Sequence, residues 1–306
     1  MLAPTSHAVP ERASSSDDPV DLLQFVVDQF RNGPVALATL SEVRGGAARA
    51  LGSHVAVAAD GRFCGYVSGG CVEAAVAAEA LLAISDGRDR VVSFGEGSPF
   101  FDIVLPCGGG LSLAIHVVRD IHPLCSVLND LRRRKAAGLC YIPKECKLSN
   151  AVTASKTGWV EDRFEVIYRP RTRLLVSGPT AEAEAVVRLA RASFYQVLQF
   201  SSATEGLNDP NAIDPFTAVV LLHHELDAEF PVLKAALRSP AFYVGALGST
   251  RTHRKRSERL RLQSFTQSDI ARIKAPIGIF GPARDATSIA LSVLGDVAAS
   301  RLAAFG

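Results

Sequence analysis

Two cysteines in glycine-rich bends are the residues of this chain best suited to do chemistry. Cys71 follows Ser68-Gly69-Gly70 and precedes a helical pattern that starts at Val72. Adjacent glycines can turn backbone N–H groups into one concavity that attracts anions, and the helix start adds its dipole. The same field favours the thiolate of Cys71, the form that acts as nucleophile and metal ligand. Cys107 stands before Gly108-Gly109-Gly110 in a second bend of this kind.

Each bend by itself also has a purely structural explanation. A lone cysteine is most often a small buried hydrophobe, and two adjacent glycines often mark only a tight turn. Glu73 lies in the first turn of the helix, where a carboxylate suits the helix dipole. The presence of two cysteine–glycine bends in one domain favours a functional interpretation of the pair.

The composition is that of a globular protein large enough for two domains. The chain has 306 residues, of which 48% are hydrophobic and 21% charged, with a net charge of +2. So small a basic surplus argues against a nucleic-acid partner. No apolar run approaches the roughly 20 residues that span a bilayer, and residues 1–17 lack the pattern of a secretory signal. We therefore expect a cytoplasmic protein with no membrane partner.

The spacing of the six cysteines does not suit a small disulfide scaffold. Neither Cys-x-x-Cys nor His-x-x-x-His, two short spacings typical of metal sites, occurs in the sequence. We therefore expect free thiols in a reducing compartment and no metal site.

The chain divides by pattern into four segments. Residues 1–17 are rich in proline, serine and charge and are expected to be a disordered leader. Residues 18–119 combine helix and strand patterns, including the hairpin signal Asp60-Gly61, and predict a small mixed α/β domain. Within it, His116 falls on the polar face of its strand and is expected to be solvated. Residues 120–170 carry weaker patterns and are interpreted as a connecting segment.

Regular alternation of strands and helices occupies residues 171–306. It predicts a Rossmann-like, doubly wound parallel sheet, so the expected fold class is α/β. A dinucleotide fingerprint would occupy the first strand–helix turn, which reads Gly178-Pro179-Thr180. Thr180 stands where glycine would let the backbone approach a pyrophosphate, and no acid follows about 20 residues later to hold a ribose. We expect no competent NAD(P) site.

The turn Gly248-Ser249-Thr250-Arg251 opens a basic helix in the second domain. A glycine, two hydroxyls and an arginine at a helix start can hold an anion. Equally, Ser249 or Thr250 can simply cap a basic surface helix. His223 follows an earlier strand at the carboxyl edge of the sheet, where ligands bind in such folds.

Several sequence blocks together carry a family resemblance. They are Ala36-Leu-Ala-Thr39, Arg49-x-x-Gly52, Asp60-Gly61, Val67-Ser-Gly-Gly-Cys-Val-Glu73, Cys107-Gly-Gly109, Tyr243-Val-Gly-Ala-Leu-Gly-Ser249, Ala271-Arg-Ile-Lys-Ala-Pro-Ile-Gly278 and Ile289-Ala-Leu-Ser-Val-Leu294. Over about residues 35–118 and 173–301 the chain resembles the XdhC/CoxI family of xanthine dehydrogenase accessory factors. The cysteine block and the Gly-Ala-Leu-Gly-Ser block make this resemblance far more specific than a lone glycine motif.

The resemblance implies a homodimeric accessory chaperone, not an enzyme, with molybdenum cofactor as its cargo. Such a protein supports sulfuration of the cofactor with a cysteine desulfurase and delivers it to a xanthine dehydrogenase-type molybdenum hydroxylase. Carried over by position, Cys71 and Cys107 are the functional thiols. The candidate cofactor-binding residues are Arg49, Ser68, Gly69, Gly70, Cys71, Glu73, Cys107, Gly108, Gly109, Gly248, Ser249 and Arg251. A soft thiolate suits molybdenum, and glycine-lined concavities suit the phosphate of the pterin.

Two other functions stay open at this stage. One is an NAD(P)-dependent oxidoreductase that uses the sheet of residues 173–306, against which the altered glycine turn counts. The other is a thiol-redox or metal-sensing module built on the two cysteines, against which the missing metal spacing counts. For the accessory factor we expect the bends of Cys71 and Cys107 to lie within one cleft.

Overall fold

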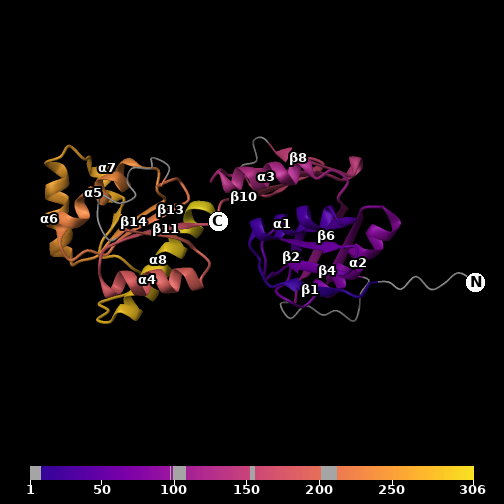
Figure 1. Cartoon of the computed structure of the whole chain (residues 1–306), viewed down its shortest axis with the longest axis horizontal. Helices are drawn as coiled ribbons and strands as arrows, with labels where there is room; N and C mark the ends of the chain where they lie inside the picture. Colours follow the sequence, from indigo (N-terminus) through magenta and orange to yellow (C-terminus); the bar gives the residue numbers. More distant parts are fainter. Residues whose placement is uncertain (1–7, 97, 99–107, 152–155, 201–211) are drawn as a thin grey trace, which may run out of the picture. The chain divides into compact units, whose positions relative to one another are not determined.

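The chain folds as two units, residues 1–170 and 171–306 (Figure 1). We analysed a computed structural model, which describes residues 8–96, 98, 108–151, 156–200 and 212–306. Cys107 lies outside the described residues. Each unit is built on its own hydrophobic cores, and each is treated by itself below.

The first unit contains a six-stranded sheet whose centre is buried on both faces. Its strand order is β1-β4-β3-β2-β6-β5, with β1 parallel to β4 and the other pairs antiparallel. The central strand β2 places Leu37 in one core and Ala38 in the other. The strands are β1 (Glu11–Ser14), β2 (Val35–Arg44), β3 (His54–Ala58), β4 (Arg62–Gly65), β5 (Arg90–Gly95) and β6 (Gly110–Val117).

Two amphipathic helices cover the two faces of this sheet. Helix α1 (Pro19–Phe30) starts where the Asp18 side chain accepts the Val20 N–H and proline takes the first position. Its buried leucines and valines join one core. Helix α2 (Glu73–Asp86) places Val76 and Ala80 in the other core and ends at Gly87 in the left-handed conformation. The predicted hairpin at Asp60-Gly61 is confirmed by the antiparallel pairing of β3 and β4.

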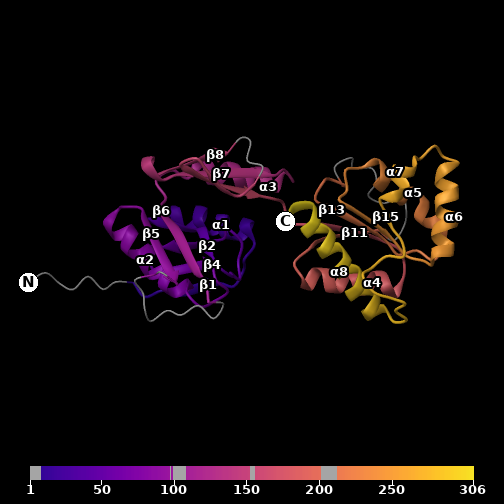
Figure 2. The ribbon, with the colours of Figure 1, turned by 180° about the vertical axis from the view of Figure 1, so that it is seen from behind.

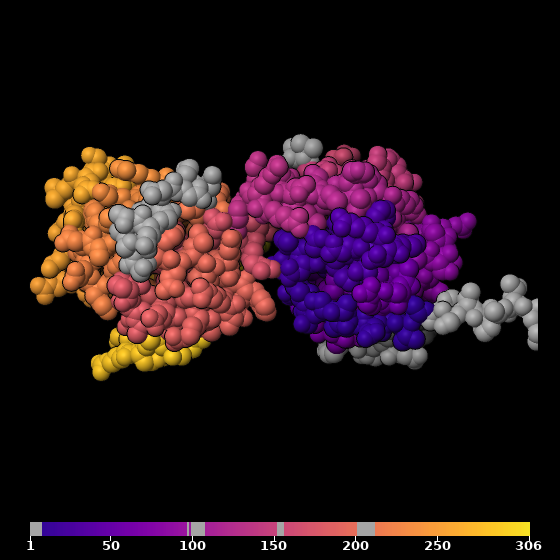
Figure 3. All heavy atoms as spheres, in the orientation of Figure 1, coloured from indigo at the N-terminus to yellow at the C-terminus, as the bar shows by residue number. Residues whose placement is uncertain are grey.

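Residues 120–170, interpreted from the sequence as a connecting segment, fold as part of the first unit. They form helix α3 (His122–Arg132) and an antiparallel sheet of order β8-β7-β10-β9, which packs with α1 into one core (Figure 3). The strands are short, and in β10 only alternate residues are buried although three of its last four are consecutive apolar residues, so the sequence pattern is weak. The strands are β7 (Ala137–Ile142), β8 (Lys147–Ala151), β9 (Gly158–Val160) and β10 (Arg163–Tyr168), with a 3₁₀ turn at Pro143–Glu145.

The expected leader also needs correction. Residues 11–14 form the edge strand β1, and the Glu11 N–H donates to the Gly61 carbonyl at 3.0 Å. The Arg12 guanidinium donates to the Gly65 carbonyl at 3.2 Å. Backbone and arginine hydrogen bonds hold this polar, largely exposed strand, so composition alone does not reveal it.

The second unit is the predicted doubly wound parallel sheet. Its strand order is β12-β11-β13-β14-β15, so the chain reverses direction across the sheet between β11 and β13. One core joins helices α4 and α8 to the sheet, and a second core joins α5, α6 and α7 to it (Figure 2). The strands are β11 (Arg173–Ser177), β12 (Gln196–Phe200), β13 (Thr217–Leu221), β14 (Tyr243–Ala246) and β15 (Ile273–Lys274). The helices are α4 (Ala181–Ala192), α5 (Leu226–Arg238), α6 (Thr250–Arg261), α7 (Gln267–Ala271) and α8 (Ala286–Phe305).

Helix α8 is the one described helix whose length and composition would allow it to cross a membrane. The sequence analysis did not single out this apolar run. The helix is a layer of the Rossmann-like unit, with Val293 and Val297 fully buried in its core. Its buried Asp296 accepts a hydrogen bond from the Tyr243 hydroxyl at 2.7 Å. Core helices pass the same length and composition test, so this is weak evidence for a span.

Candidate functional site

Cys71 lies exposed in a tight bend between β4 and α2. The bend depends on two glycines, because Gly69 and Gly70 have φ angles of 104° and 122° that other residues rarely adopt. The Cys71 N–H donates to the Ser68 hydroxyl at 3.1 Å, which fixes the backbone that carries the thiol. The bend therefore presents one exposed sulfur on a backbone held by local hydrogen bonds.

The buried carboxylate of Glu73 fills the concavity of this bend. It accepts N–H groups from Val67 at 2.9 Å, Ser68 at 2.8 Å, Gly69 at 3.1 Å and Gly70 at 2.9 Å. Burial by itself would raise the pKa of Glu73, but the hydrogen bonds from Ser68 and Val67 outweigh burial and lower it. The carboxylate is therefore charged at neutral pH and acts as the anion of the concavity.

This arrangement corrects the part that the sequence analysis gave to the bend. The amides of Gly69 and Gly70 do hold an anion, but it is the protein's own Glu73, which is only 1% exposed. The Ser68 hydroxyl donates to the same carboxylate and accepts from the Cys71 and Val72 amides. The two glycines in the sequence indicated an anion-binding concavity, but the sequence did not show that the Glu73 carboxylate occupies it.

Arg49 lies in the loop between β2 and β3, beside the aromatic ring that precedes the Cys71 bend. Its guanidinium is 5.2 Å from the centre of the Tyr66 ring and makes a 2.7 Å ion pair with Asp17. Arg12 lies over the same ring at 4.3 Å. Two guanidinium groups around one tyrosine form a cationic cluster that can attract an anionic ligand. The sequence analysis found Arg49 and missed Arg12, because Arg12 was assigned to the leader.

Both glycine bends lie against the loop that carries Arg49. A Cβ atom on Gly69 would lie 3.6 Å from the Ala48 side chain. A Cβ atom on Gly109 would lie only 2.4 Å from the Arg44 carbonyl oxygen and 2.6 Å from that of Gly46, so glycine is required there. Gly108 has a φ of 68° and no such close neighbour. The segments around Gly69 and Gly109, which are far apart in the sequence, therefore both lie close to residues 44–48. The position of the Cys107 sulfur stays a prediction.

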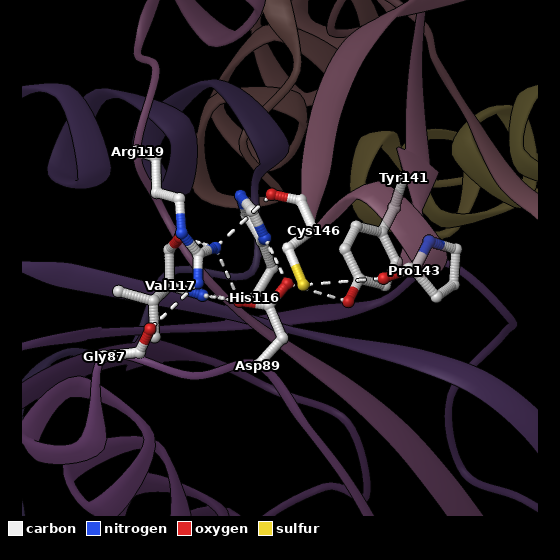
Figure 4. A network of polar contacts seen from close by, with 8 residues as sticks. All are labelled: Gly87, Asp89, His116, Val117, Arg119, Tyr141, Pro143 and Cys146. Atoms are coloured by element: carbon white, nitrogen blue, oxygen red, sulfur yellow. Dashed lines mark hydrogen bonds and ion pairs between the residues drawn. The ribbon is translucent and has the colours of Figure 1, made fainter.

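A second polar cluster joins the two sheets of this unit around Asp89 (Figure 4). Its carboxylate is 2.7 Å from His116 Nδ1 and accepts the Tyr141 hydroxyl at 2.9 Å and the Arg119 guanidinium at 2.7 Å. His116 is therefore buried, at 3% exposure, and the expectation that it is solvated was wrong. Burial would raise the pKa of Asp89, but the hydrogen bonds from His116 and Arg119 hold it well below its usual range. None of the contacts drawn in Figure 4 reaches a candidate residue among the described parts of the chain, and we interpret the cluster as a structural joint.

In the second unit, Ser249 caps helix α6. Its hydroxyl accepts the Thr252 N–H at 3.3 Å, and Gly248 has a φ of 122°. Arg251 points from an exposed position of the first turn. Arg256 of this basic helix is fully buried and paired with Glu229 of α5. The structure therefore shows Ser249 as the N-cap of α6. An anion bound at the same turn stays a prediction.

The carboxyl edge of the second sheet places a serine and a histidine together at the point where the strand order reverses. The Ser177 hydroxyl is 2.9 Å from His223 Nε2, and both residues are buried. The Thr180 hydroxyl accepts the Ala183 N–H and donates to the Leu222 carbonyl. Thr180 is thus engaged in holding the turn at which a dinucleotide would bind. Among the described residues no three acidic, cysteine or histidine side chains are grouped so as to hold a metal ion.

Each of the two units matches a known protein-family model. Residues 30–95 match the model of the XdhC and CoxI family, and residues 174–297 match the XdhC Rossmann domain. The chain is 48% identical over 294 residues to the molybdenum cofactor insertion chaperone PaoD of Escherichia coli, covering 96% of this chain and 92% of that protein. The chain belongs to the XdhC and CoxI family.

Two further comparisons are more distant. This XdhC/CoxI family member is 26% identical to the uncharacterized protein YqeB of Escherichia coli, over 87% of its own length and 43% of the length of YqeB. It also resembles the crystal structure of a xanthine dehydrogenase from Bacillus halodurans, with a TM-score of 0.71 and 19% identity, covering 94% and 96% of the two chains. At that identity the structural likeness shows the shared fold alone.

Proposed function

We propose that this XdhC/CoxI family member binds molybdenum cofactor and inserts it into a molybdenum enzyme, with Cys71 as a direct contact. One observation carries the proposal. An exposed thiol lies on a bend braced by Glu73, in a chain 48% identical to a molybdenum cofactor insertion chaperone along nearly its whole length. A thiolate is a soft ligand that suits molybdenum or a sulfur atom in transfer.

The residues around Cys71 suit the remaining chemistry of such a cargo. Arg12 and Arg49 place two guanidinium groups beside the bend, and arginine is well matched to phosphate. Glu73 shapes the bend from beneath and does not itself contact the cargo, since it is buried. Cys107 and its glycines are proposed to supply the second contact, and Gly248, Ser249 and Arg251 an anion site of the second unit.

The finer parts of the proposal concern partners and place. We propose sulfuration of the bound cofactor with a cysteine desulfurase and delivery to a hydroxylase of the xanthine dehydrogenase type. We further propose a cytoplasmic homodimer without a catalytic activity of its own. A protein that only carries and protects a cargo needs binding groups but no general acid or base, which agrees with an exposed thiol and flanking cations.

The test is purification from cells that make molybdenum cofactor, followed by measurement of bound molybdenum, oxidised pterin and nicotinamide nucleotide. We expect molybdenum and pterin with the wild-type protein and a large loss of both with Cys71→Ser. Cys146→Ser is the matched control, because Cys146 is partly exposed in the same unit but lies in a different cluster. A Cys71→Ser, Cys107→Ser double variant that still carries pterin and activates its client would refute the proposal. Bound NAD(P) with turnover would favour the oxidoreductase instead.

A further inference from the structure

We propose that the first unit holds a binding pocket for a small aromatic carboxylate, whose cation Arg49 is paired with Asp17 in this structure. The pocket is open to one side and has a volume of about 160 Å³ between the first sheet and strand β10. The pocket is lined by the ion pair and by Leu51, His54, Tyr66 and Tyr168 among other residues. None of the cysteines lines the pocket within the described residues, although the pocket shares Arg49 with the proposed contacts of the cofactor.

The charge at the pocket selects an anion. Arg49 Nη1 is 2.7 Å from a carboxylate oxygen of Asp17, a residue that reaches it from the segment before α1. Burial lowers the pKa of His54 to about 4, although a hydrogen bond with the Ala38 backbone acts to raise it. The histidine lining the pocket is therefore neutral at pH 7, and the positive charge belongs to Arg49. Asp17 already shows that a carboxylate fits this guanidinium, so a ligand carboxylate can take its place.

The size of the pocket limits the ligand to a single ring. A cavity of about 150 Å³ is enough to bind benzene, whereas pockets for larger ligands span roughly 300–1,000 Å³. At about 160 Å³ the pocket holds a single-ring compound but not a complete pterin cofactor. Its walls include the apolar side chains of Leu22, Leu51 and Val166. Gly52 keeps these walls close, since a Cβ atom there would lie 2.7 Å from the Thr157 methyl.

The aromatic side chains of the pocket favour a ring that is itself aromatic. His54 and Tyr168 lie stacked, with ring centres 5.8 Å apart and planes 21° apart. Their polar atoms bond one another, His54 Nε2 to the Tyr168 hydroxyl at 2.6 Å, while His54 Nδ1 is 3.0 Å from the Thr39 hydroxyl. With these groups paired, the pocket offers a ligand ring π-surface in place of open hydrogen-bonding groups. Tyr66 adds a third ring beside Arg49.

Calorimetric titration of the purified full chain with benzoate and with benzamide tests the proposal. The two compounds share a shape, but only benzoate carries the charge that Arg49 would bind. We expect benzoate to bind roughly tenfold more tightly than benzamide, as suits a hydrogen bond to a charged group. Arg49→Gln should abolish this preference. Asp17→Asn should tighten benzoate binding by roughly twofold to fivefold, because the competing internal carboxylate is gone.

The controls separate the pocket from general effects of charge. Asp60→Asn and Arg62→Gln alter an exposed ion pair of the same unit and should leave benzoate binding unchanged. Fluorescence of Trp159, the lone tryptophan, checks that each variant is folded. Equal binding of benzoate and benzamide overturns the proposal, and so does an absence of benzoate binding in both the wild type and Asp17→Asn. Acetate binding as tight as benzoate binding also overturns it, because a simple surface anion site would then suffice.

Discussion

The Glu73 carboxylate accepts the Gly70 N–H at 2.9 Å and so ties the start of α2 to the glycines in front of it. The same carboxylate takes three further backbone N–H groups of the bend. An exposed loop rich in glycine loses much conformational entropy when it is ordered, and an internal anion offsets that cost. Cys71 therefore gains a defined position at the protein surface without being buried.

Removal of the charge on Glu73 should weaken the bend. We expect Glu73→Gln to lower the free energy of unfolding by about 1–3 kcal/mol, because the buried N–H groups lose a charged acceptor. The same change should speed alkylation of Cys71, since the backbone that carries the thiol is held less firmly once Ser68 and the glycines lose their charged acceptor. Urea unfolding followed by Trp159 fluorescence, and mass spectrometry of alkylated Cys71, give the two measurements.

Glu79→Gln is the matched control for this prediction. Glu79 lies on the same helix but pairs with Arg90 at a more exposed position, where such pairs contribute about 1 kcal/mol or less. Equal effects of Glu73→Gln and Glu79→Gln on unfolding and on Cys71 alkylation would contradict the role that we assign to Glu73.

His54 should make the first unit sensitive to acid. Burial lowers its pKa from 6.5 to about 4, so protons bind more readily to the unfolded chain. The neutral, buried ring makes its full contribution to the free energy of unfolding above pH 6.5. Roughly 3 kcal/mol of this free energy is lost as the pH falls toward 4. We expect His54→Gln to flatten this part of the pH profile in Trp159-monitored unfolding, whereas the exposed His122→Gln should leave it unchanged. A wild-type profile that is flat between pH 6.5 and 4 would rule this out.

Asp89 should be essential to the joint between the two sheets of the first unit. Its carboxylate accepts from Arg119 and Tyr141, contacts His116, and also accepts the Val117 N–H at 3.1 Å. Asp89→Asn replaces one acceptor oxygen with an amide donor, and we expect a loss of about 3–5 kcal/mol of stability.

The pH profile and a surface variant check the role of Asp89. Because its pKa is lowered in the folded state, its contribution is present above the unfolded pKa and is lost below about pH 4. This acid loss should be absent from Asp89→Asn. Asp60→Asn, at an exposed ion pair, should cost less than about 1 kcal/mol in the same unfolding assay. If the two variants unfold alike, the joint is not a stabilising element.

The buried ion pair of Glu229 and Arg256 should affect the stability of the second unit mainly when only one of its two charges is removed. Both side chains are fully buried, and Arg256 Nη2 also donates to the Leu247 carbonyl at 2.8 Å. Glu229→Gln leaves a buried guanidinium without its counter-charge, at a cost of about 3–5 kcal/mol. The double variant Glu229→Met, Arg256→Met should be far less destabilised, because no charge is left unpaired. Hydrogen exchange of α5 and α6 measures both, and a double variant as unstable as the single one would count against this reasoning.

The sequence by itself determined the architecture of the second unit and the location of the glycine bend that carries Cys71. Strands and helices alternate there with their own periodicities, and each crossover is local, so pattern and topology agree. Gly69 and Gly70 mark the bend for a similar reason, since their conformations are set within a few residues. Local chemistry of this kind is visible in the order of residues alone.

Only the tertiary structure decided what occupies the bend and which distant residues meet. The sequence placed Glu73 at a helix start, but its contact with four backbone N–H groups depends on how the bend closes over it. It likewise left Arg12, His116 and Tyr168 without a role, because their partners lie tens of residues away along the chain. Burial and pairing are properties of packed elements, so the periodicity of a single segment cannot specify them.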